Sequence, residues 1–243
     1  MWSELRGLKD GIDYGTPPRD GPPITLEVDG VRVTVPAGSS VMLAATEARR
    51  AIAKLCATDT LEAFGSCRVC LVEIEGRNGF PASCTTLVAE GMKVRTQSER
   101  LARLRKGVLE LYLSDLPASE LAGGWSELHE TLRAEGVSSH RYGPGTNHFD
   151  APVDASNPYF LFDPAKCIVC SRCVRACAET QGTFALTIAG RGFGSKVAAS
   201  QDQPFFESEC VSCGACVQAC PSHALVEKSL FPGGYCRAEP PQA

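Results

Sequence analysis

Residues 167–177 read CIVCSRCVRAC, and residues 210–221 read CVSCGACVQACP. Both stretches have the spacing C-x2-C-x2-C-x3-C, and the second follows the first by 43 residues. In this spacing, three cysteines wrap one face of a [4Fe–4S] cubane, while the fourth begins a helix and points back to the other cubane. The pattern therefore predicts two [4Fe–4S] clusters in the C-terminal part of the chain.

The eight cysteines of these two runs divide into two predicted ligand sets, because the last cysteine of each run belongs to the other cluster. One cluster is predicted to use Cys167, Cys170, Cys173 and Cys220, and the other Cys177, Cys210, Cys213 and Cys216. Gly214 favours close passage of the backbone beside the sulfur atoms. Zinc is the alternative for C-x2-C pairs, but zinc sites use two pairs per metal and not fused runs of four. We expect no bound zinc.

A third set of four cysteines lies earlier in the chain: Cys56, Cys67, Cys70 and Cys84, separated by ten, two and thirteen residues. A long loop would supply the first ligand, a C-x2-C pair the next two and a distant residue the last. This arrangement suits a [2Fe–2S] cluster at the edge of a small domain, and we favour it over zinc. The first gap differs from the C-x4-C of plant-type ferredoxins. Gly65 and Ser66 fit a loop that wraps close to inorganic sulfide.

The residues around this third set predict an α+β domain of the β-grasp type over residues 23–95. Apolar and polar residues alternate over 24–28 and 31–35, with Asp29-Gly30 as a tight hairpin turn. Strand-like stretches follow at 70–75 and 91–94. Between them, Ser39 or Ser40 can cap a helix. The buried stripe of this helix is expected to be Val41, Ala44/Ala45, Ala48, Ile52 and Leu55.

Residues 96–158 are predicted to be a helical connector. Thr96-Gln97-Ser98-Glu99 fits a capping box, in which Thr96 and Glu99 satisfy backbone amides at the start of a helix that runs to about Leu113. Its inward residues are expected to be Leu101, Leu104, Val108 and Leu111. Its cations, Arg100, Arg103, Arg105 and Lys106, are interpreted as a solvated face, with docking of an acidic partner as the alternative. A second helical stretch over 119–135 leads into a loop that ends at Pro158.

The remaining segments are an arm, the C-terminal domain and a tail. Residues 1–22 show no apolar period and are predicted to form an extended arm. The bacterial-ferredoxin-like domain with two [4Fe–4S] clusters occupies 159–232, and 233–243 form the tail. Cys236 is the thirteenth cysteine, left over after three complete sets, and is predicted to be a free thiol.

Composition excludes several classes of protein. The chain has 243 residues, of which 44% are hydrophobic, which is too apolar for a disordered chain. Its 24 Lys and Arg against 28 Asp and Glu give a net charge of −4, which argues against nucleic-acid binding. No apolar run approaches the ~18 residues of a membrane helix, and the N-terminus is too charged for a signal peptide. We therefore expect a cytoplasmic protein that uses cysteine for metal binding and not for disulfides.

Other candidate chemistry is weak. Residues 190–194, GRGFG, lack the spacing of a dinucleotide fingerprint and are interpreted as a turn. The four histidines show no regular metal-binding spacing, and surface or capping roles are favoured for them: His129, His140, His148 and His223. We find no paired carboxylates, nucleophilic triad or phosphate loop, and we expect no catalytic residue on this chain.

The cysteine pattern resembles a known family. The third set, with GSCRVC over 65–70, is similar to the N-terminal [2Fe–2S] domain of the large iron–sulfur subunit of respiratory complex I, which also occurs in NAD-reducing hydrogenases and NAD-dependent formate dehydrogenases. The stretches SNPYF at 156–160, DPAKCIVC at 163–170 and QGTFALTI at 181–188 resemble the iron–sulfur region of soluble molybdenum or tungsten formate dehydrogenases. The match continues through 209–221 and covers about residues 24–230.

Two departures from this family alter what the resemblance implies. A pterin-binding catalytic domain usually follows on the same polypeptide, whereas this sequence stops at Ala243, so we expect the catalytic domain on a separate subunit. The family also carries a His/Cys-ligated [4Fe–4S] cluster with the pattern H-x3-C-x2-C-x5-C after the β-grasp domain. The corresponding residues 114–124 contain neither histidine nor cysteine, so we expect that cluster to be absent.

The resemblance implies an electron-transfer subunit of an NAD-dependent formate dehydrogenase. Its partners would be a molybdopterin catalytic subunit with Mo or W and flavin- and NAD-binding diaphorase subunits. The alternative is the diaphorase iron–sulfur subunit of an NAD-reducing hydrogenase. A redox sensor is a third interpretation, but the sequence has neither a basic stripe nor a helix-turn-helix for nucleic acid.

Overall fold

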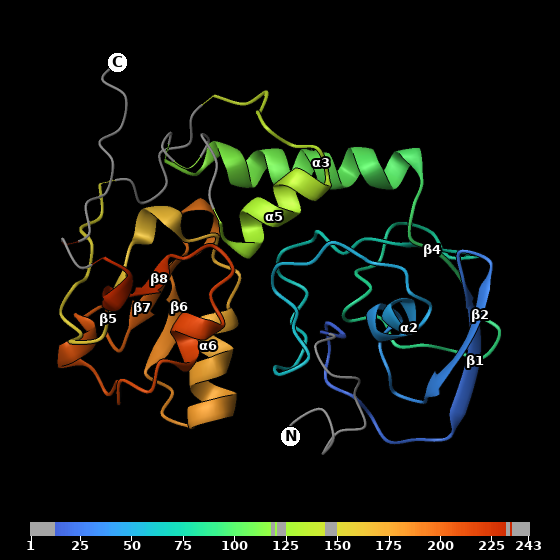
Figure 1. Ribbon diagram of the computed structural model, residues 1–243, viewed down its shortest axis with the longest axis horizontal. Helices are drawn as coiled ribbons and strands as arrows, with labels where there is room; N and C mark the ends of the chain where they lie inside the picture. The colour runs from blue at the N-terminus through green and yellow to red at the C-terminus, as the bar shows by residue number, and fades with distance from the viewer. Residues whose placement is uncertain (1–12, 118–119, 121–124, 144–149, 232–233, 235–243) are drawn as a thin grey trace. The chain divides into compact units, whose positions relative to one another are not determined.

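The computed structural model (Figure 1) describes residues 13–117, 120, 125–143, 150–231 and 234. The chain divides into two compact units, Met1–Val108 and Leu109–Ala243. This boundary falls inside the connector predicted over 96–158. Of the predicted arm, residues 1–12 lie outside the described residues, as does all of the predicted tail except Gly234.

The first unit is built on a four-stranded mixed sheet with the strand order β2-β1-β4-β3. The strands are β1 (Pro23–Val28), β2 (Val31–Pro36), β3 (Glu73–Ile74) and β4 (Lys93–Arg95). β1 pairs antiparallel with β2 and parallel with β4, while β3 pairs antiparallel with β4. The predicted hairpin and later strands are confirmed, although both later strands are shorter than expected.

The turn between β1 and β2 has left-handed backbone at both central residues, with φ of 46° at Asp29 and 79° at Gly30. Two positive φ angles define the turn that best matches the twist of a hairpin. The Asp29 carboxylate accepts hydrogen bonds from the backbone N–H of Thr96 at 2.8 Å and from its hydroxyl at 2.5 Å. The turn therefore also anchors the chain where it leaves β4.

The helix α2 (Val41–Glu47) is capped by Ser40, whose hydroxyl accepts from the N–H of Leu43 at 3.0 Å. It is shorter than the periodicity predicts. Arg49 adopts a left-handed conformation with φ 57°, and the N–H of Arg50 donates to the carbonyl of Ala45 at 2.8 Å, a bond that closes the helix end. Ile52 and Leu55 are buried as expected, but they belong to the extended segment that follows.

The helix α3 (Glu99–Ser114) buries a different stripe from the one predicted. Leu104 and Leu111 are exposed, while the buried positions follow a four-residue step: Leu101, Arg105, Leu109 and Leu113. Arg105 is fully buried, so its assignment to a solvated face is wrong. Because the charged residue Arg105 occupies a buried position, the pattern of apolar residues alone does not reveal the buried face of α3.

The cap of α3 also differs from the prediction. The Ser98 hydroxyl accepts from the N–H of Leu101 at 3.2 Å, and Ser98 is therefore the capping residue. The hydroxyl of Thr96, predicted to cap, instead donates to Asp29. The Thr96 hydroxyl therefore makes a tertiary hydrogen bond with Asp29 and does not cap the helix in the way that the local pattern predicts.

The second unit contains two separate two-stranded sheets. β5 (Phe160–Phe162) pairs antiparallel with β8 (Leu225–Glu227), and β6 (Leu186–Ala189) with β7 (Lys196–Ala199). The segment 190–194 lies between β6 and β7, as a turn should. The aromatic part of the core consists of Phe160, Phe162 and Phe205. The ring centroid of Phe205 lies 5.2 Å from that of Phe160 and 6.0 Å from that of Phe162.

The helices of this unit are short and include α6 (Arg172–Arg175), which runs into a π-helical stretch, η2 (Ala176–Gln181). α7 (Ala215–Gln218) is the counterpart of α6 in the second cysteine run. Single 3-10 turns complete the unit: η1 (Pro164–Lys166), η3 (Gly192–Gly194), η4 (Phe205–Glu207) and η5 (Lys228–Leu230).

The second predicted connector helix corresponds to α5 (Glu127–Ala134). It is half as long as the predicted range 119–135, of which residues 119 and 121–124 lie outside the described residues. Ser126 caps α5, since its hydroxyl accepts from the N–H of His129 at 3.5 Å. The N–H of Leu128 donates to the carbonyl of Pro221 at 2.8 Å, so α5 packs on the segment that follows the second cysteine run.

Candidate functional site

The first unit gathers the four cysteines at positions 56, 67, 70 and 84 in its interior, each at most 3% exposed. The Sγ atoms of Cys70 and Cys84 lie 3.4 Å apart, and the backbone N–H of Cys67 donates to Cys56 Sγ at 3.5 Å. None of the twelve described cysteines of the chain is in a disulfide. The structure thus brings together the set predicted from the x10, x2, x13 spacing.

These four thiols influence one another's ionisation. Hydrogen bonding from the Cys84 thiol lowers the pKa of Cys70 to about 7, against the opposing effect of burial. Hydrogen bonds from Cys67 and Cys84 lower the pKa of Cys56 far below its ordinary value. The donors lose acidity in turn, so the pKa values of Cys67 and Cys84 are raised. Because metal-bound cysteines are thiolates, metal binding here would release protons.

Backbone contacts hold the loop that carries these thiols. The N–H of Ser83 donates to the carbonyl of Cys70 at 2.9 Å, which ties two of the cysteine segments together. Buried Arg105 donates from Nη2 to the carbonyl of Leu71 at 2.9 Å and to that of Thr96 at 2.5 Å. Arg105 is a site-supporting residue that sequence reasoning missed, because a cation among other cations on a helix indicates a solvated face.

The two cysteine runs of the second unit repeat one another in backbone conformation. Val169 and Ser171 are left-handed in the first run, with φ 51° and 65°, and Ser212 and Gly214 are left-handed at the matching positions, with φ 55° and 77°. The N–H two residues beyond the first cysteine of each run donates to its Sγ at 3.4 Å. A Cβ on Gly214 would meet no protein atom within 4 Å, so its left-handed backbone explains this glycine better than close packing does.

Thiols of the two runs influence one another across the runs, and these effects are largest within the two predicted ligand sets. Burial raises the pKa of Cys173, and the next contributions come from the nearby thiols of Cys167, Cys170 and Cys220. Burial likewise raises the pKa of Cys216 to about 12, followed by effects of Cys210, Cys213 and Cys177. We call the group Cys167, Cys170, Cys173 and Cys220 the first site, and Cys177, Cys210, Cys213 and Cys216 the second site.

The chemistry of these groups fits iron–sulfur clusters. Each group offers four sulfur donors, and backbone N–H groups point at the sulfurs, as at Cys167, Cys210 and Cys220. Within the described residues, no group of three or more His, Cys, Asp or Glu side chains is arranged to hold one metal ion. A cubane binds each of its four thiolates on a different iron atom, so four sulfur donors match one cluster.

Other candidate residues lie apart from these thiols. His129 is buried, so a surface role is wrong for it; its Nδ1 is 2.7 Å from the Ser126 hydroxyl, and its Nε2 is 3.1 Å from the carbonyl oxygen of Glu120. His223 packs against Trp125, with ring centroids 4.0 Å apart. His140 contacts the carbonyl of Tyr142. His148 and Cys236 lie outside the described residues.

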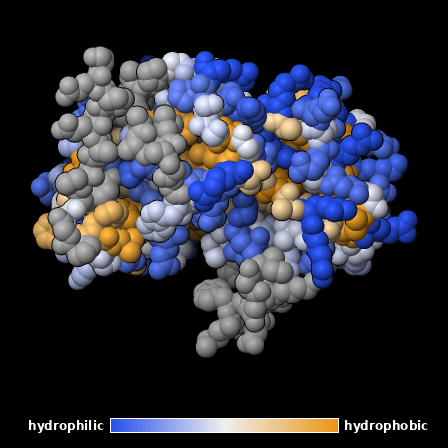
Figure 2. All heavy atoms as spheres, turned by 45° about the horizontal axis from the view of Figure 1, so that its top comes forward, coloured by the Kyte–Doolittle hydropathy of each residue, from blue (hydrophilic) through white to orange (hydrophobic). Residues whose placement is uncertain are grey.

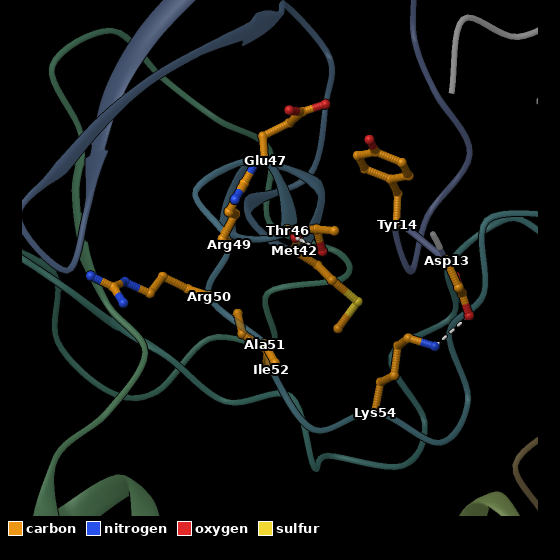
Figure 3. Close-up of a pocket in the computed structure, with 10 residues that line it drawn as sticks. All are labelled: Asp13, Tyr14, Met42, Thr46, Glu47, Arg49, Arg50, Ala51, Ile52 and Lys54. Carbon is orange, nitrogen blue, oxygen red and sulfur yellow. Dashed lines mark hydrogen bonds and ion pairs between the residues drawn. The ribbon is translucent and has the colours of Figure 1, made fainter. Parts of the chain in front are cut away.

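A pocket of about 460 Å³ lies in the first unit beside the end of α2 (Figure 3). Asp13 and Lys54 form an ion pair of 2.5 Å at its edge. Burial raises the pKa of Asp13, but the charge and hydrogen bond of Lys54 together with backbone hydrogen bonds from Gly15 and Asp59 outweigh it, so the pKa of Asp13 is lowered. None of the lining residues is a cysteine, and we assign the pocket no part in electron transfer.

Comparison with known proteins defines the class. Residues 21–99 match the model of the 2Fe-2S iron-sulfur cluster binding domain, and residues 166–224 match that of the 4Fe-4S dicluster domain. The chain is therefore an iron–sulfur protein that combines these two domains. This class agrees with the predicted β-grasp [2Fe–2S] domain and two-cluster [4Fe–4S] domain.

Individual relatives define the family. A chain in the crystal structure of NAD+-reducing [NiFe]-hydrogenase in the H2-reduced state superposes with a TM-score of 0.75 and 31% identity, over 85% of this chain and 88% of that one. The chain belongs to the family of iron–sulfur proteins that includes this hydrogenase chain. It is also 36% identical over 180 residues to the mitochondrial NADH-ubiquinone oxidoreductase 78 kDa subunit of Candida albicans, covering 70% of this chain and 24% of that protein.

A third relative is NADP-reducing hydrogenase subunit HndD of Solidesulfovibrio fructosivorans. It is 37% identical over 214 residues, which cover 84% of this chain and 36% of that protein. The chain thus spans about a quarter to a third of the length of these curated relatives.

Among the described residues, none of the helices has the length and apolar character that a membrane span requires. Hydrophobic and hydrophilic residues are interspersed over the face shown in Figure 2.

Proposed function

We propose that this chain is an electron-transfer protein that binds one [2Fe–2S] and two [4Fe–4S] clusters and works in a multi-subunit NAD(P)-linked oxidoreductase. The observation that carries the proposal is that twelve free cysteines, in the spacing of three sets of four, lie inside the two domains matched by iron–sulfur families. Cys56, Cys67, Cys70 and Cys84 hold the [2Fe–2S] cluster, and the first and second sites each hold one [4Fe–4S] cluster.

The bound clusters would supply one-electron chemistry, at potentials set by charge, hydrogen bonds to sulfur and solvent exposure. Two of these controls, hydrogen bonds to sulfur and solvent exposure, can be described for this chain. Backbone N–H groups of Val169, Ser212 and Leu225 donate to cysteine sulfurs at 3.4 to 3.5 Å. Most of the thiols are buried, which limits solvent access, while Cys213 is exposed and marks where a redox partner can approach.

The partners follow by analogy with relatives. The names of the relatives link them to NADH, NADP and hydrogenase chemistry, which supports flavin- and nicotinamide-binding partner subunits. For the catalytic partner, the match to a hydrogenase chain over most of both lengths favours an NAD-reducing hydrogenase. The stretches 156–160, 163–170 and 181–188 favour a molybdopterin formate dehydrogenase. A cytoplasmic location remains part of this proposal.

Affinity purification of the tagged chain from its native cells under anaerobic conditions, followed by metal analysis, separates these partners. Nickel with H2-dependent NAD(P) reduction identifies the hydrogenase, whereas Mo or W with formate-dependent reduction identifies the formate dehydrogenase. A complex with flavin but without nickel, Mo or W would exclude both catalytic partners. The purified chain itself should contain about ten iron atoms, and about fourteen would reveal a fourth cluster.

A further inference from the structure

The two cysteine runs of the second unit have the same spacing and backbone but different charge: the first carries two arginines, and the second carries no charged residue. Matching positions are 43 residues apart, and α6 and α7 begin and end at matching residues. The two arginines of the first run have no cationic counterpart in the second, since Arg172 matches Ala215 and Arg175 matches Gln218; directly before the runs, Lys166 matches Glu209. Two sites of one architecture therefore lie in different electrostatic surroundings.

Arg172 is the most deeply placed of these cations. It stands between Cys170 and Cys173 in the chain, and it is 3% exposed. Its Nη1 donates to Oε2 of Glu127, the first residue of α5, at 2.8 Å. Because Arg172 is excluded from water and its backbone belongs to the loop that carries Cys170 and Cys173, solvent screens its positive charge only weakly.

Glu127, which is partly exposed, forms the ion pair with Arg172. The next residue, Leu128, donates its N–H to the carbonyl of Pro221, which directly follows the first-site residue Cys220. α5 therefore contacts both chain segments that carry first-site thiols. The side chain of Glu127 is 45% exposed, so its own charge is partly screened by water, whereas that of Arg172 is not.

The second site lacks such a buried cation, and two exposed glutamates precede its run. Glu209 directly precedes Cys210 and is exposed, and Glu207 is exposed as well. The hydroxyl of Ser200 donates to the Glu209 carboxylate and fixes its position beside Cys210. A negative charge beside a site disfavours the addition of an electron, and a positive charge favours it.

We propose that Arg172, oriented by Glu127, makes the first site easier to reduce than the second, so that the second unit moves electrons from the second site to the first. The inference rests on the proposed function, since it needs both clusters bound. In this step the second site loses one electron and the first site gains it; no bond forms or breaks and no proton moves. Arg172 stabilises the added negative charge, and the exposed Cys213 lets electrons enter at the second site.

The test is an EPR-monitored redox titration of the full chain with its clusters bound, with dithionite as reductant, on variants of opposite sign. Arg172→Gln should make the first site about tenfold harder to reduce, a downward shift of about 59 mV for a one-electron couple. Glu127→Gln should shift the same signal upwards, because it removes a negative charge and leaves Arg172 in place. Arg172→Lys should retain most of the wild-type potential.

Two controls keep electrostatics apart from structural damage. Glu130→Gln removes an exposed charge from the same helix and should leave both potentials unchanged. The second-site signal should stay constant in all the α5 and α6 variants. Equal potentials for the Arg172→Gln variant and the wild type, or shifts of the same sign for Arg172→Gln and Glu127→Gln, would overturn the inference. A chain that binds no clusters would instead overturn the proposed function itself.

Discussion

Replacing Arg105 by leucine should loosen the first unit around its cysteines. Arg105 is fully buried, and its Nη2 serves the carbonyls of Leu71 and Thr96 at 2.9 and 2.5 Å. Leucine fills much of the same volume but leaves both buried carbonyls without this donor. Each lost partner costs about 1–3 kcal/mol, so the variant should be destabilised by about 3 kcal/mol. If this cost appears mainly in the unfolding rate, unfolding becomes about a hundredfold faster.

The assay is the decay of the [2Fe–2S] circular dichroism signal in urea under anaerobic conditions. The [4Fe–4S] signals of the same molecules provide an internal control, because their thiols belong to the other unit. Arg103→Leu removes an exposed cation from the same helix and should change the decay rate less than about threefold. The decay rate of Arg105→Lys should lie between those of Arg105→Leu and Arg103→Leu. Equal decay rates for Arg105→Leu and Arg103→Leu would refute the assignment of Arg105 as the support of the cysteine loop.

Three further outcomes are expected. Gly214→Ala places a Cβ on a backbone with φ 77°, which should destabilise the second unit by about 1 kcal/mol. The [4Fe–4S] absorbance should then be lost about fivefold faster in urea. Ser171→Gly, at the matching position of the first run, should slow the loss of this absorbance. Burial lowers the pKa of His223, and Lys166 and His129 add to this effect. The folded state therefore disfavours protonated His223. The free energy of unfolding is highest above pH 6.5, the ordinary pKa of histidine, and decreases as the pH falls below that value. Cluster loss should therefore accelerate from pH 7.5 to pH 5.5, and His223→Gln should flatten this dependence. Cys236→Ser should retain every cluster signal in EPR, and loss of one would contradict the assignment of three complete sets.

The sequence by itself determined the class of the protein and predicts the grouping of its thiols. Cysteine spacing is a local property, and a cluster demands four sulfurs at fixed positions, so the runs 167–177 and 210–220 predict their own geometry. The hairpin around Asp29-Gly30 was predictable for the same reason, because the turn depends on residues adjacent in sequence.

Tertiary structure decided what local patterns cannot encode. Thr96 bonds to Asp29 instead of capping α3, and Arg105 lies inside the stripe where leucine was expected. In both cases a polar side chain finds its partner far away in the sequence, and that contact outweighs local propensity. The same holds for Arg172, whose position between two cysteines is visible in the sequence, but whose ion pair with Glu127 forms only when α5 packs beside the first cysteine run within the second unit.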